Sequence, residues 1–444
     1  MIAYLPQVFF IVVLLLGIGY FVTNVKKLAR NINLGKNVVV DDHKSQRLTN
    51  MFKIAFGQTK MVVRPVSGFL HAIVYVGFII INIEVLEIII DGIFGTHRIG
   101  LSVLPESVYG FLIGTFEVLA VLVLVAVVIF WLRRNVIKLK RFLSAEMTGW
   151  PKNDANIILY IEVVLMCLFL TMNATDTAFQ DLNSGNIVSQ FLAPLFDGLS
   201  ESTLHGIERV AWWLHIVGIL AFLNYLYFSK HLHILLAFPN TYYGKLTPKG
   251  QFPNNETVTK EVKLMMDPSA DPFAAPAEDL SSGEGGTPVP DKFGASDVMD
   301  LNWVQLLNAY TCTECGRCTS ECPANQTGKK LSPRKIMMDT RDRLEEVGKN
   351  IDANKGTFVP DGKQLLGDYI THEELWACTT CNACVQACPV SIDPLSIIMD
   401  MRQYLVMEQS AAPSDLNTMM GNIENNGAPW PFNQQDRLNW SNES

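Results

Sequence analysis

The sequence predicts an all-α protein in two parts, a membrane bundle of five transmembrane helices followed by a mostly α-helical, cysteine-rich domain. Hydrophobic residues make up 49% of the 444 residues, yet nearly all the long apolar runs precede residue 240. Eight of the nine cysteines instead fall between residues 312 and 388. A chain of this length has room for more than one domain, and the two compositions indicate two different environments.

Five segments are long and apolar enough to cross a bilayer, which takes about 20 helical residues. They are residues 5–22, 63–90, 108–132, 156–172 and 207–228. The first segment has no basic residue before it and no small-residue cleavage pattern, and Lys26, Lys27 and Arg30 follow it. We therefore expect a retained first helix rather than a signal peptide.

Basic residues are unevenly distributed among the connecting loops. Residues 24–62 hold eight Lys or Arg and residues 133–155 hold six, whereas residues 91–107 hold only Arg98 and residues 174–204 hold none. Because cytoplasmic loops are enriched in these residues, we expect a multi-pass protein of the bacterial inner (cytoplasmic) membrane. Its N-terminus would lie outside, and everything after the fifth span would lie in the cytoplasm.

The composition divides the chain further. We expect a membrane domain over residues 1–238 and a flexible linker over residues 239–297, which are rich in Pro, Gly, Ser and Asn. The cysteine-rich domain then covers residues 298–407, and residues 408–444 form a polar tail. A net charge of −8 gives no reason to expect nucleic-acid binding, and the common nucleotide-binding and hydrolase motifs are missing from the sequence.

Both cysteine runs have the spacing Cys-x2-Cys-x2-Cys-x3-Cys-Pro. In such a run three closely spaced thiolates reach three irons of a cubane from one loop, and the fourth lies on the following turn. Each run therefore predicts a [4Fe–4S] cluster, and together they predict a two-cluster ferredoxin-like domain. Zinc sites do not require a third cysteine at this spacing, and disulfides are not expected in a reducing compartment.

In two-cluster ferredoxins the fourth cysteine of each run binds the other cluster. We therefore expect one cluster to be bound by Cys312, Cys315, Cys318 and Cys388. The other cluster would be bound by Cys378, Cys381, Cys384 and Cys322. Two such clusters indicate a protein that transfers electrons.

Several histidines lie within or beside apolar segments, where titratable side chains are costly and indicate function. His71 lies in the second predicted span, His215 in the fifth, and His233 at the cytoplasmic end of the fifth. On one continuous helix, the 18 residues from His215 to His233 would make close to five turns, placing both rings on one face about 27 Å apart. That arrangement suits two stacked haems, and antiparallel second and fifth spans would let His71 and His233 hold one b-type haem. Packing remains the alternative role for each histidine.

The first 240 residues resemble the cytochrome b (gamma) subunit of respiratory nitrate reductase and the membrane subunit of heterodisulfide reductase. The resemblance is carried by Ser67-Gly68-Phe69-Leu70-His71, Trp213-Leu214-His215 and Ser229-Lys230-His231-Leu232-His233. It implies four histidine ligands for two haems, of which His71, His215 and His233 match three. Ile81 and Asn82 stand near the fourth position, so a second haem would need another ligand, such as His205 or His97.

The C-terminal third resembles the two-cluster C subunit of heterodisulfide reductase. The resembling segments are Asn302-Trp303, Leu306-Leu307, Thr313-Glu314-Cys315-Gly316-Arg317-Cys318 and Leu375-Trp376-Ala377-Cys378. The resemblance implies the electron-transfer subunit of a quinone-linked oxidoreductase complex. Its partner would be a cytoplasmic subunit with a paired-cysteine motif, or a flavoprotein.

We therefore expect electrons to pass between the (mena)quinone pool, a b-type haem, two [4Fe–4S] clusters and a cytoplasmic partner. The alternative is a redox-sensing or anchoring membrane iron–sulfur protein that carries no respiratory flux. Glu84, Glu87, Asp91 and Glu117 lie in or near the second and third spans. One of them could accept a quinol proton, or all could be interfacial or helix-capping carboxylates.

Overall fold

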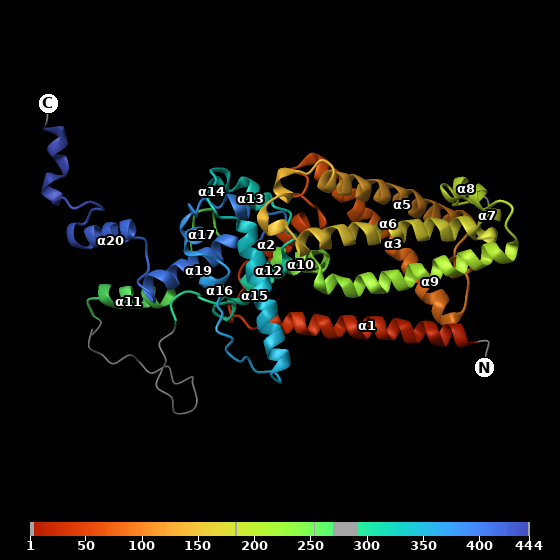
Figure 1. Cartoon of the computed structure of the whole chain (residues 1–444), viewed down its shortest axis with the longest axis horizontal. Coiled ribbons are helices and arrows are strands. Elements are labelled where there is room, and N and C mark those ends of the chain that lie inside the picture. Colours follow the sequence, from red (N-terminus) through yellow and green to blue (C-terminus); the bar gives the residue numbers. More distant parts are fainter. Residues whose placement is uncertain (1–3, 183, 253, 270–291, 443–444) are drawn as a thin grey trace.

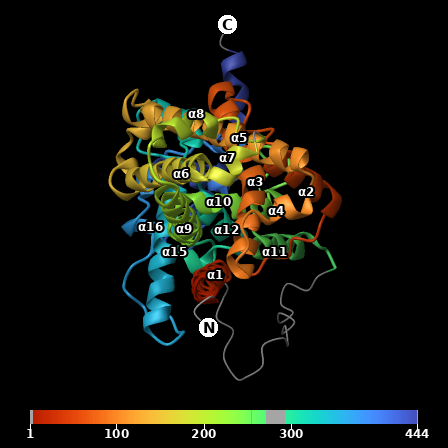
Figure 2. The same cartoon turned by 90° about the vertical axis from the view of Figure 1, so that its right-hand side faces the viewer.

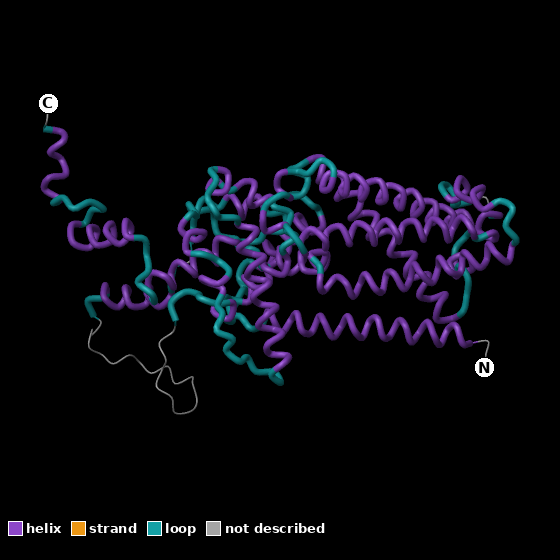
Figure 3. The backbone as a smooth tube through the Cα atoms, viewed as in Figure 1, coloured by secondary structure: helices purple, strands orange, loops and turns teal. Residues whose placement is uncertain are grey.

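The computed structural model describes residues 4–182, 184–252, 254–269 and 292–442. These residues form helices joined by loops, with isolated β-bridges but no strand (Figures 1 and 3). This confirms the predicted all-α class. Five helices are long and apolar enough to cross a membrane. They are α1 (Leu5–Ile32), α3 (Pro65–Phe94), α5 (Glu106–Asn135), α6 (Trp150–Thr175) and α9 (Glu201–Tyr225).

Shorter helices connect the long ones or follow them. Those in the membrane part are α2 (Lys44–Met51), η2 (Phe52–Phe56), α4 (Ile99–Val103), η3 (Lys140–Phe142), η4 (Ala145–Met147), α7 (Thr177–Asp181), α8 (Ser189–Leu192), η5 (Ala193–Phe196), η6 (Leu226–Phe228), η7 (Lys230–Leu232) and α10 (His233–Tyr242). Those in the cysteine-rich part are η8 (Val298–Asp300), α12 (Trp303–Thr311), α13 (Arg317–Glu321), α14 (Pro323–Gln326), α15 (Pro333–Ala353), α16 (Leu365–Asp368), α17 (His372–Trp376), α18 (Ala383–Ala387) and α19 (Pro394–Met407).

The five long helices pack into a closed ring, seen end-on in Figure 2. Helix α1 contacts α3, α3 contacts α5, α5 contacts α6, α6 contacts α9, and α9 returns to α1. Buried aromatic and aliphatic side chains fill the ring, including Phe10, Phe116, Phe169 and Ile216. Successive helices run in opposite directions, so the ends of α1, α5 and α9 and the starts of α3 and α6 share one end of the bundle (Figure 1). We call this the cluster end, and the opposite end the far end.

Local sequence sets where the long helices begin and end. Helix α3 starts with Pro65 in its first turn and ends at Gly95, whose φ of 71° suits glycine. Helix α9 starts after Ser200, whose hydroxyl accepts a hydrogen bond from the Thr203 N–H. These local signals therefore fix where α3 begins and ends and where α9 begins.

Helix α9 ends at Tyr225, whereas we expected one continuous helix from His215 through His233. Helix α9 is followed by η6, an extended Ser229, η7 and then α10. Asp154 of α6 holds the break, because its carboxylate accepts hydrogen bonds from the Tyr225 hydroxyl (2.7 Å) and the Lys230 N–H (3.1 Å). The helical phase that related His215 to His233 therefore does not apply.

The cysteine-rich domain is docked on the cluster end (Figure 1). One hydrophobic core runs from Leu28, Phe222 and Leu226 of the bundle into Leu306 and Tyr310 of α12. Hydrogen bonds reinforce this core, such as the one that the Asn31 amide donates to the Tyr310 hydroxyl (2.9 Å). The two parts are thus packed against each other rather than merely tethered.

The segments expected as linker and tail contain further helices. Helix α11 (Glu256–Met266) lies in the first, while residues 270–291 of the expected linker lie outside the described residues. Ala295 is already fully buried and its N–H donates to the Asp400 carbonyl (3.0 Å), so packing on the cysteine-rich domain begins before residue 298. The tail forms α20 (Ser414–Asn426) and η9 (Gln434–Ser441), which extend away from the domain (Figure 1).

Candidate functional site: the cysteine loops and the histidine pair

The first cysteine loop (residues 312–318) and the second cysteine loop (residues 378–384) have matching backbones. In both, the residue before the second cysteine has a left-handed φ, 53° at Glu314 and 55° at Thr380. The residue after that cysteine is left-handed as well, with φ of 71° at Gly316 and 60° at Asn382. Because non-glycine residues rarely adopt such angles, their repetition indicates two loops shaped for the same task.

The structure brings cysteines of the two runs together. The short helices that follow the loops, α13 and α18, pack against each other. Burial raises the pKa of Cys318 well above its usual range, and the nearby thiol groups of Cys315, Cys312, Cys388 and Cys384 raise it further. Cys388 and Cys384 of the second run therefore both lie near Cys318 of the first loop.

The reciprocal arrangement holds for the other run. Burial raises the pKa of Cys384, and Asp393, Cys378 and Cys322 add to this effect in that order. Cys322, the last cysteine of the first run, thus lies near the second loop. A thiol in such a group loses its proton readily only when a cation is bound beside it. Burial also raises the pKa of Cys312 to about 12.

Basic residues from the bundle surround the first loop. The buried Arg317 guanidinium donates hydrogen bonds to the Lys60 carbonyl (3.0 Å), the Met61 carbonyl (3.2 Å) and the Met61 sulfur (3.1 Å). Lys60 donates to the Ser391 hydroxyl (3.1 Å), just beyond Cys388. Arg64 bonds to Ser320 and Glu321. The first loop therefore faces the membrane bundle.

The second loop faces away from these bundle contacts. Cys381 is exposed, whereas Cys312, Cys322, Cys384 and Cys388 are buried. Arg402 of α19 donates to the Cys378 carbonyl (2.6 Å) and to the Leu375 carbonyl (2.6 Å). This loop therefore combines one arginine contact with direct access to solvent.

His71 of α3 and His233 at the start of α10 face each other at the cluster end, with ring centres 6.4 Å apart. Two imidazoles bound to one iron at about 2.0 Å would have ring centres about 6.4 Å apart. His233 Nδ1 contacts the Lys230 carbonyl (3.1 Å), which leaves Nε2 free to bind a metal. His71 Nδ1 is buried without a hydrogen-bond partner in the described residues. The 6.4 Å separation of the rings is therefore compatible with a metal held between the two imidazoles.

His215 is not part of such a pair. Its Nδ1 contacts the Leu165 carbonyl (3.1 Å), and its ring lies 6.2 Å from that of Phe169. The two candidate second ligands lie elsewhere, because His97 contacts Asp176 (3.2 Å) and His205 lies exposed near Glu208 (3.8 Å) at the far end. The structure thus assigns His215 two packing partners and no second histidine.

Some residues of this region escaped the sequence analysis. Lys60 counted there only as a loop charge, Arg64 was not singled out, and Arg317 counted only as part of a resembling segment. His231, which appeared there only in a resembling segment, lies with its ring 5.4 Å from that of His233. The signal that could have singled out Lys60 and Arg64 was their position at the start of a span that carries a histidine two turns later.

The candidate carboxylates of the spans differ in their partners. Glu87 accepts hydrogen bonds from the Gly100 N–H (2.9 Å) and the Tyr109 hydroxyl (3.2 Å). Asp91 accepts from the N–H groups of Arg98 (2.8 Å) and Ile99 (3.1 Å). These bonds give both carboxylates a structural role at the far end of α3.

Glu117 is also fully bonded. It accepts hydrogen bonds from the Asn173 amide (3.0 Å) and from the N–H groups of Val188 (2.7 Å) and Ser189 (3.0 Å). It therefore anchors the start of α8 to α5. Among the described residues, no hydrogen-bond partner reaches Glu84 Oε2.

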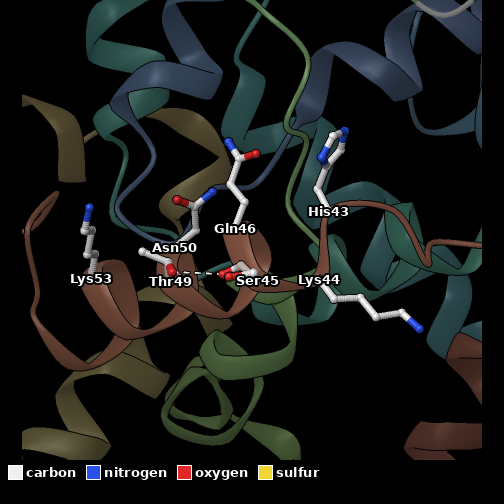
Figure 4. Close-up of a pocket in the computed structure, with 7 residues that line it drawn as sticks. All are labelled: His43, Lys44, Ser45, Gln46, Thr49, Asn50 and Lys53. Atoms are coloured by element: carbon white, nitrogen blue, oxygen red, sulfur yellow. Dashed lines mark hydrogen bonds between the residues drawn. The ribbon is translucent and has the colours of Figure 1, made fainter.

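A polar surface hollow lies along α2. Figure 4 shows its lining, with the Thr49 hydroxyl donating to the Ser45 carbonyl (2.9 Å). The other lining residues are His43, Lys44, Gln46, Asn50 and Lys53. These side chains do not point toward a common buried group, so we assign no functional site to the hollow.

Comparison with known proteins agrees with the two-part structure. Residues 311–392 match the family described as a 4Fe-4S dicluster domain. The chain is 28% identical over 466 aligned residues to a probable iron–sulfur-binding oxidoreductase, FadF, of Bacillus subtilis, covering 98% of this chain and 60% of that protein. It is 25% identical over 435 residues to the EtfAB:quinone oxidoreductase of Syntrophomonas wolfei, covering 91% of this chain and 55% of that protein.

A shorter match covers only a third of the chain. It is 32% identical over 163 residues to a probable membrane-anchored ferredoxin of Chromohalobacter salexigens, or 33% of this chain and 24% of that protein. The chain thus spans little more than half the length of the first two relatives. No solved structure matches it significantly. Taken with the five candidate spans, these matches identify a membrane protein that carries electrons on two [4Fe–4S] clusters bound by the cysteines of its C-terminal dicluster domain.

Proposed function

We propose that this chain is the electron-transfer subunit of a quinone-linked oxidoreductase. Electrons would pass between a quinone in the membrane, one b-type haem and the two [4Fe–4S] clusters, to or from a separate redox partner. The observation that carries this proposal is the His71–His233 pair, whose ring centres lie 6.4 Å apart at the bundle end on which the cluster domain is docked.

His71 and His233 are the proposed haem ligands. The Lys230 carbonyl orients the His233 ring so that Nε2 points away from its own backbone contact. A b-type haem with two imidazole ligands supplies one-electron transfer rather than oxygen binding. Only one haem is proposed, because His215 contacts Leu165 and Phe169 instead of a second histidine.

The proposed cluster ligands follow the crossed arrangement of the cysteines. The cluster nearer the bundle is bound by Cys312, Cys315, Cys318 and Cys388, and the other by Cys378, Cys381, Cys384 and Cys322. Arg317 of the first loop contacts Lys60 and Met61, just before the start of α3, which supports transfer between the haem and the nearer cluster. The exposed Cys381 supports exchange between the second cluster and a partner.

The cluster domain would lie in the cytoplasm, and residues 1–238, 239–297, 298–407 and 408–444 are the proposed functional divisions of the chain. The loops at the cluster end carry most of the basic residues of the membrane part, which supports this orientation. One relative is named as joining EtfAB to a quinone, and this favours a flavoprotein over a paired-cysteine subunit as the partner.

The test is to purify the full chain from membranes and to measure haem as the pyridine haemochrome beside iron and sulfide. The proposal requires one low-spin b-type haem for each pair of clusters, reducible by menadiol. Clusters without haem, or a haem that menadiol does not reduce, would contradict it. The first of these results would instead favour a membrane-anchored ferredoxin without a quinone link.

A further inference from the structure

The far half of the bundle holds a buried polar network in which one carboxylate stands apart. Glu87, Asp91 and Glu117 each accept at least two hydrogen bonds, as described above. Glu84 is only 3% exposed, and its Oε2 has no hydrogen-bond partner within the described ranges. A buried polar atom without a hydrogen-bond partner costs folding free energy. Glu84 is therefore the one of these four carboxylates that can form a hydrogen bond with a bound ligand.

The charged groups nearest to Glu84 are already engaged. They are Arg98, Glu87 and Glu117. Arg98 donates to Asp176 (2.6 Å) and Asn173 (2.9 Å). No neighbouring cation is therefore free to form an ion pair with Glu84, and its oxygen remains available to a hydrogen-bonding group that comes from outside the chain.

The position of Glu84 limits what that ligand can be. The residue shares the α5-facing side of α3 with Gly77, where an added Cβ would lie 2.5 Å from Val123 of α5. The neighbouring Ile83 and Leu86 are 50% and 60% exposed on the outside of the bundle, where lipid would lie. A ligand that reaches Glu84 from the bilayer must be lipid-soluble and must carry a hydroxyl or carbonyl oxygen. A quinone or quinol head group meets both requirements.

We propose that Glu84 binds the head group of the membrane quinone and exchanges its proton, an inference that rests on the quinone-linked function proposed above. Glu84 follows His71 by 13 residues on α3, which is about 20 Å along the helix axis. The head group would therefore lie between the far end and the histidine pair.

The chemistry balances in two equal steps. In each, one quinol O–H bond would break, its proton would form an O–H bond with the Glu84 carboxylate, and one electron would reduce a ferric b-type haem, the acceptor class proposed above. Before the second step Glu84 would release its proton toward the far end, and the haem would become ferric again by passing its electron to the nearer [4Fe–4S] cluster. One quinol thus yields one quinone, two protons and two electrons, and the reverse sequence reduces a quinone.

The test uses the full chain with its cofactors and three variants. Glu84→Gln keeps the shape of the side chain but cannot accept a proton, and Glu84→Asp keeps the carboxyl group. Asn82→Leu is the matched control, because Asn82 lies at the same depth and contacts only the Phe78 carbonyl of its own helix (2.5 Å). Three measurements are made: reduction by dithionite, the rate of haem reduction by menadiol, and binding of the fluorescent quinol analogue 2-heptyl-4-hydroxyquinoline N-oxide.

We expect Glu84→Gln to slow menadiol-driven reduction by about 100-fold, the lower range for loss of a general base. It should also weaken binding of the quinol analogue by about tenfold. Dithionite reduction and the haem spectrum should remain unchanged, Glu84→Asp should recover part of the rate, and Asn82→Leu should behave like the unaltered protein.

The outcomes separate this inference from the function on which it rests. If menadiol reduces the unaltered protein and Glu84→Gln equally fast, or if the analogue binds both equally, Glu84 is a packing residue and this inference fails alone. If menadiol reduces neither, although dithionite reduces both, the quinone-linked function fails and takes this inference with it.

Discussion

Replacing Arg317 by methionine should lower the reduction potential of one cluster and leave that of the other unchanged. Arg317 is 4% exposed and carries a positive charge that acts on Cys315 and Cys388, two proposed ligands of the nearer cluster. A reduced cluster carries one more negative charge than an oxidised one, so a neighbouring cation favours reduction. Removing that cation should therefore make the nearer cluster harder to reduce.

The expected size follows from the electrostatics. A unit charge about 7 Å away contributes about 2 kcal/mol at an effective dielectric constant of about 20. Since about 1.4 kcal/mol corresponds to about 59 mV for one electron, Arg317→Met should lower the potential by roughly 100 mV. The domain should stay docked, because Arg64 still bonds to Ser320 and Glu321, and Lys60 to Ser391.

Arg402→Met provides the matched control. Arg402 acts on Cys378 of the second loop and donates to its carbonyl, so its removal should lower the potential of the second cluster instead. A redox titration followed by electron paramagnetic resonance resolves the two clusters. If Arg317→Met shifts both potentials equally, or shifts neither, the placement of Arg317 beside one cluster has no electrostatic consequence and the reasoning is refuted.

Three further changes test other parts of the structure. His71→Ala should abolish the haem Soret band while His215→Ala retains it, and equal loss in both variants would contradict a single haem held by His71 and His233. Cys388→Ser should remove the same paramagnetic signal as Cys312→Ser, whereas signals that differ between the two would refute the crossed ligand sets. Glu117→Ala leaves two buried donors and one half-buried donor without an acceptor, which should cost about 3 kcal/mol. A thermal melt in detergent should show this loss, and an unchanged melting temperature would show that water replaces the carboxylate.

The order of the helices could be predicted from the sequence because it depends on local properties of the chain. Five runs of apolar residues separated by charged loops indicate spans wherever they occur, and all five appear as helices. The cysteine spacing is equally local, since loops of the same spacing at Cys312 and Cys378 adopt the same left-handed angles. The residues that terminate α3 and begin α9 also act within one turn of the helix end.

The relation between His215 and His233 could not be predicted in this way. It assumed a continuous helix, but Asp154 holds the chain in a break after Tyr225. Asp154 lies 71 residues before Tyr225 in the sequence. The sequence around Tyr225 does not indicate this contact. Hydrogen bonds between distant residues thus removed the helical phase that was expected to relate His215 to His233.

The sequence by itself therefore determined the five spans, the dicluster domain and the residue types able to bind metal. Only the tertiary structure decided the contacts between distant residues that no pattern predicted, such as Asp154 with Tyr225 and Lys230, and Arg317 with the segment before α3. It also distinguished Glu84 from three other carboxylates that looked equivalent along the chain. The physical reason is that helix formation and loop shape depend on neighbours in sequence, whereas partners for buried polar groups come from whichever helix packs beside them.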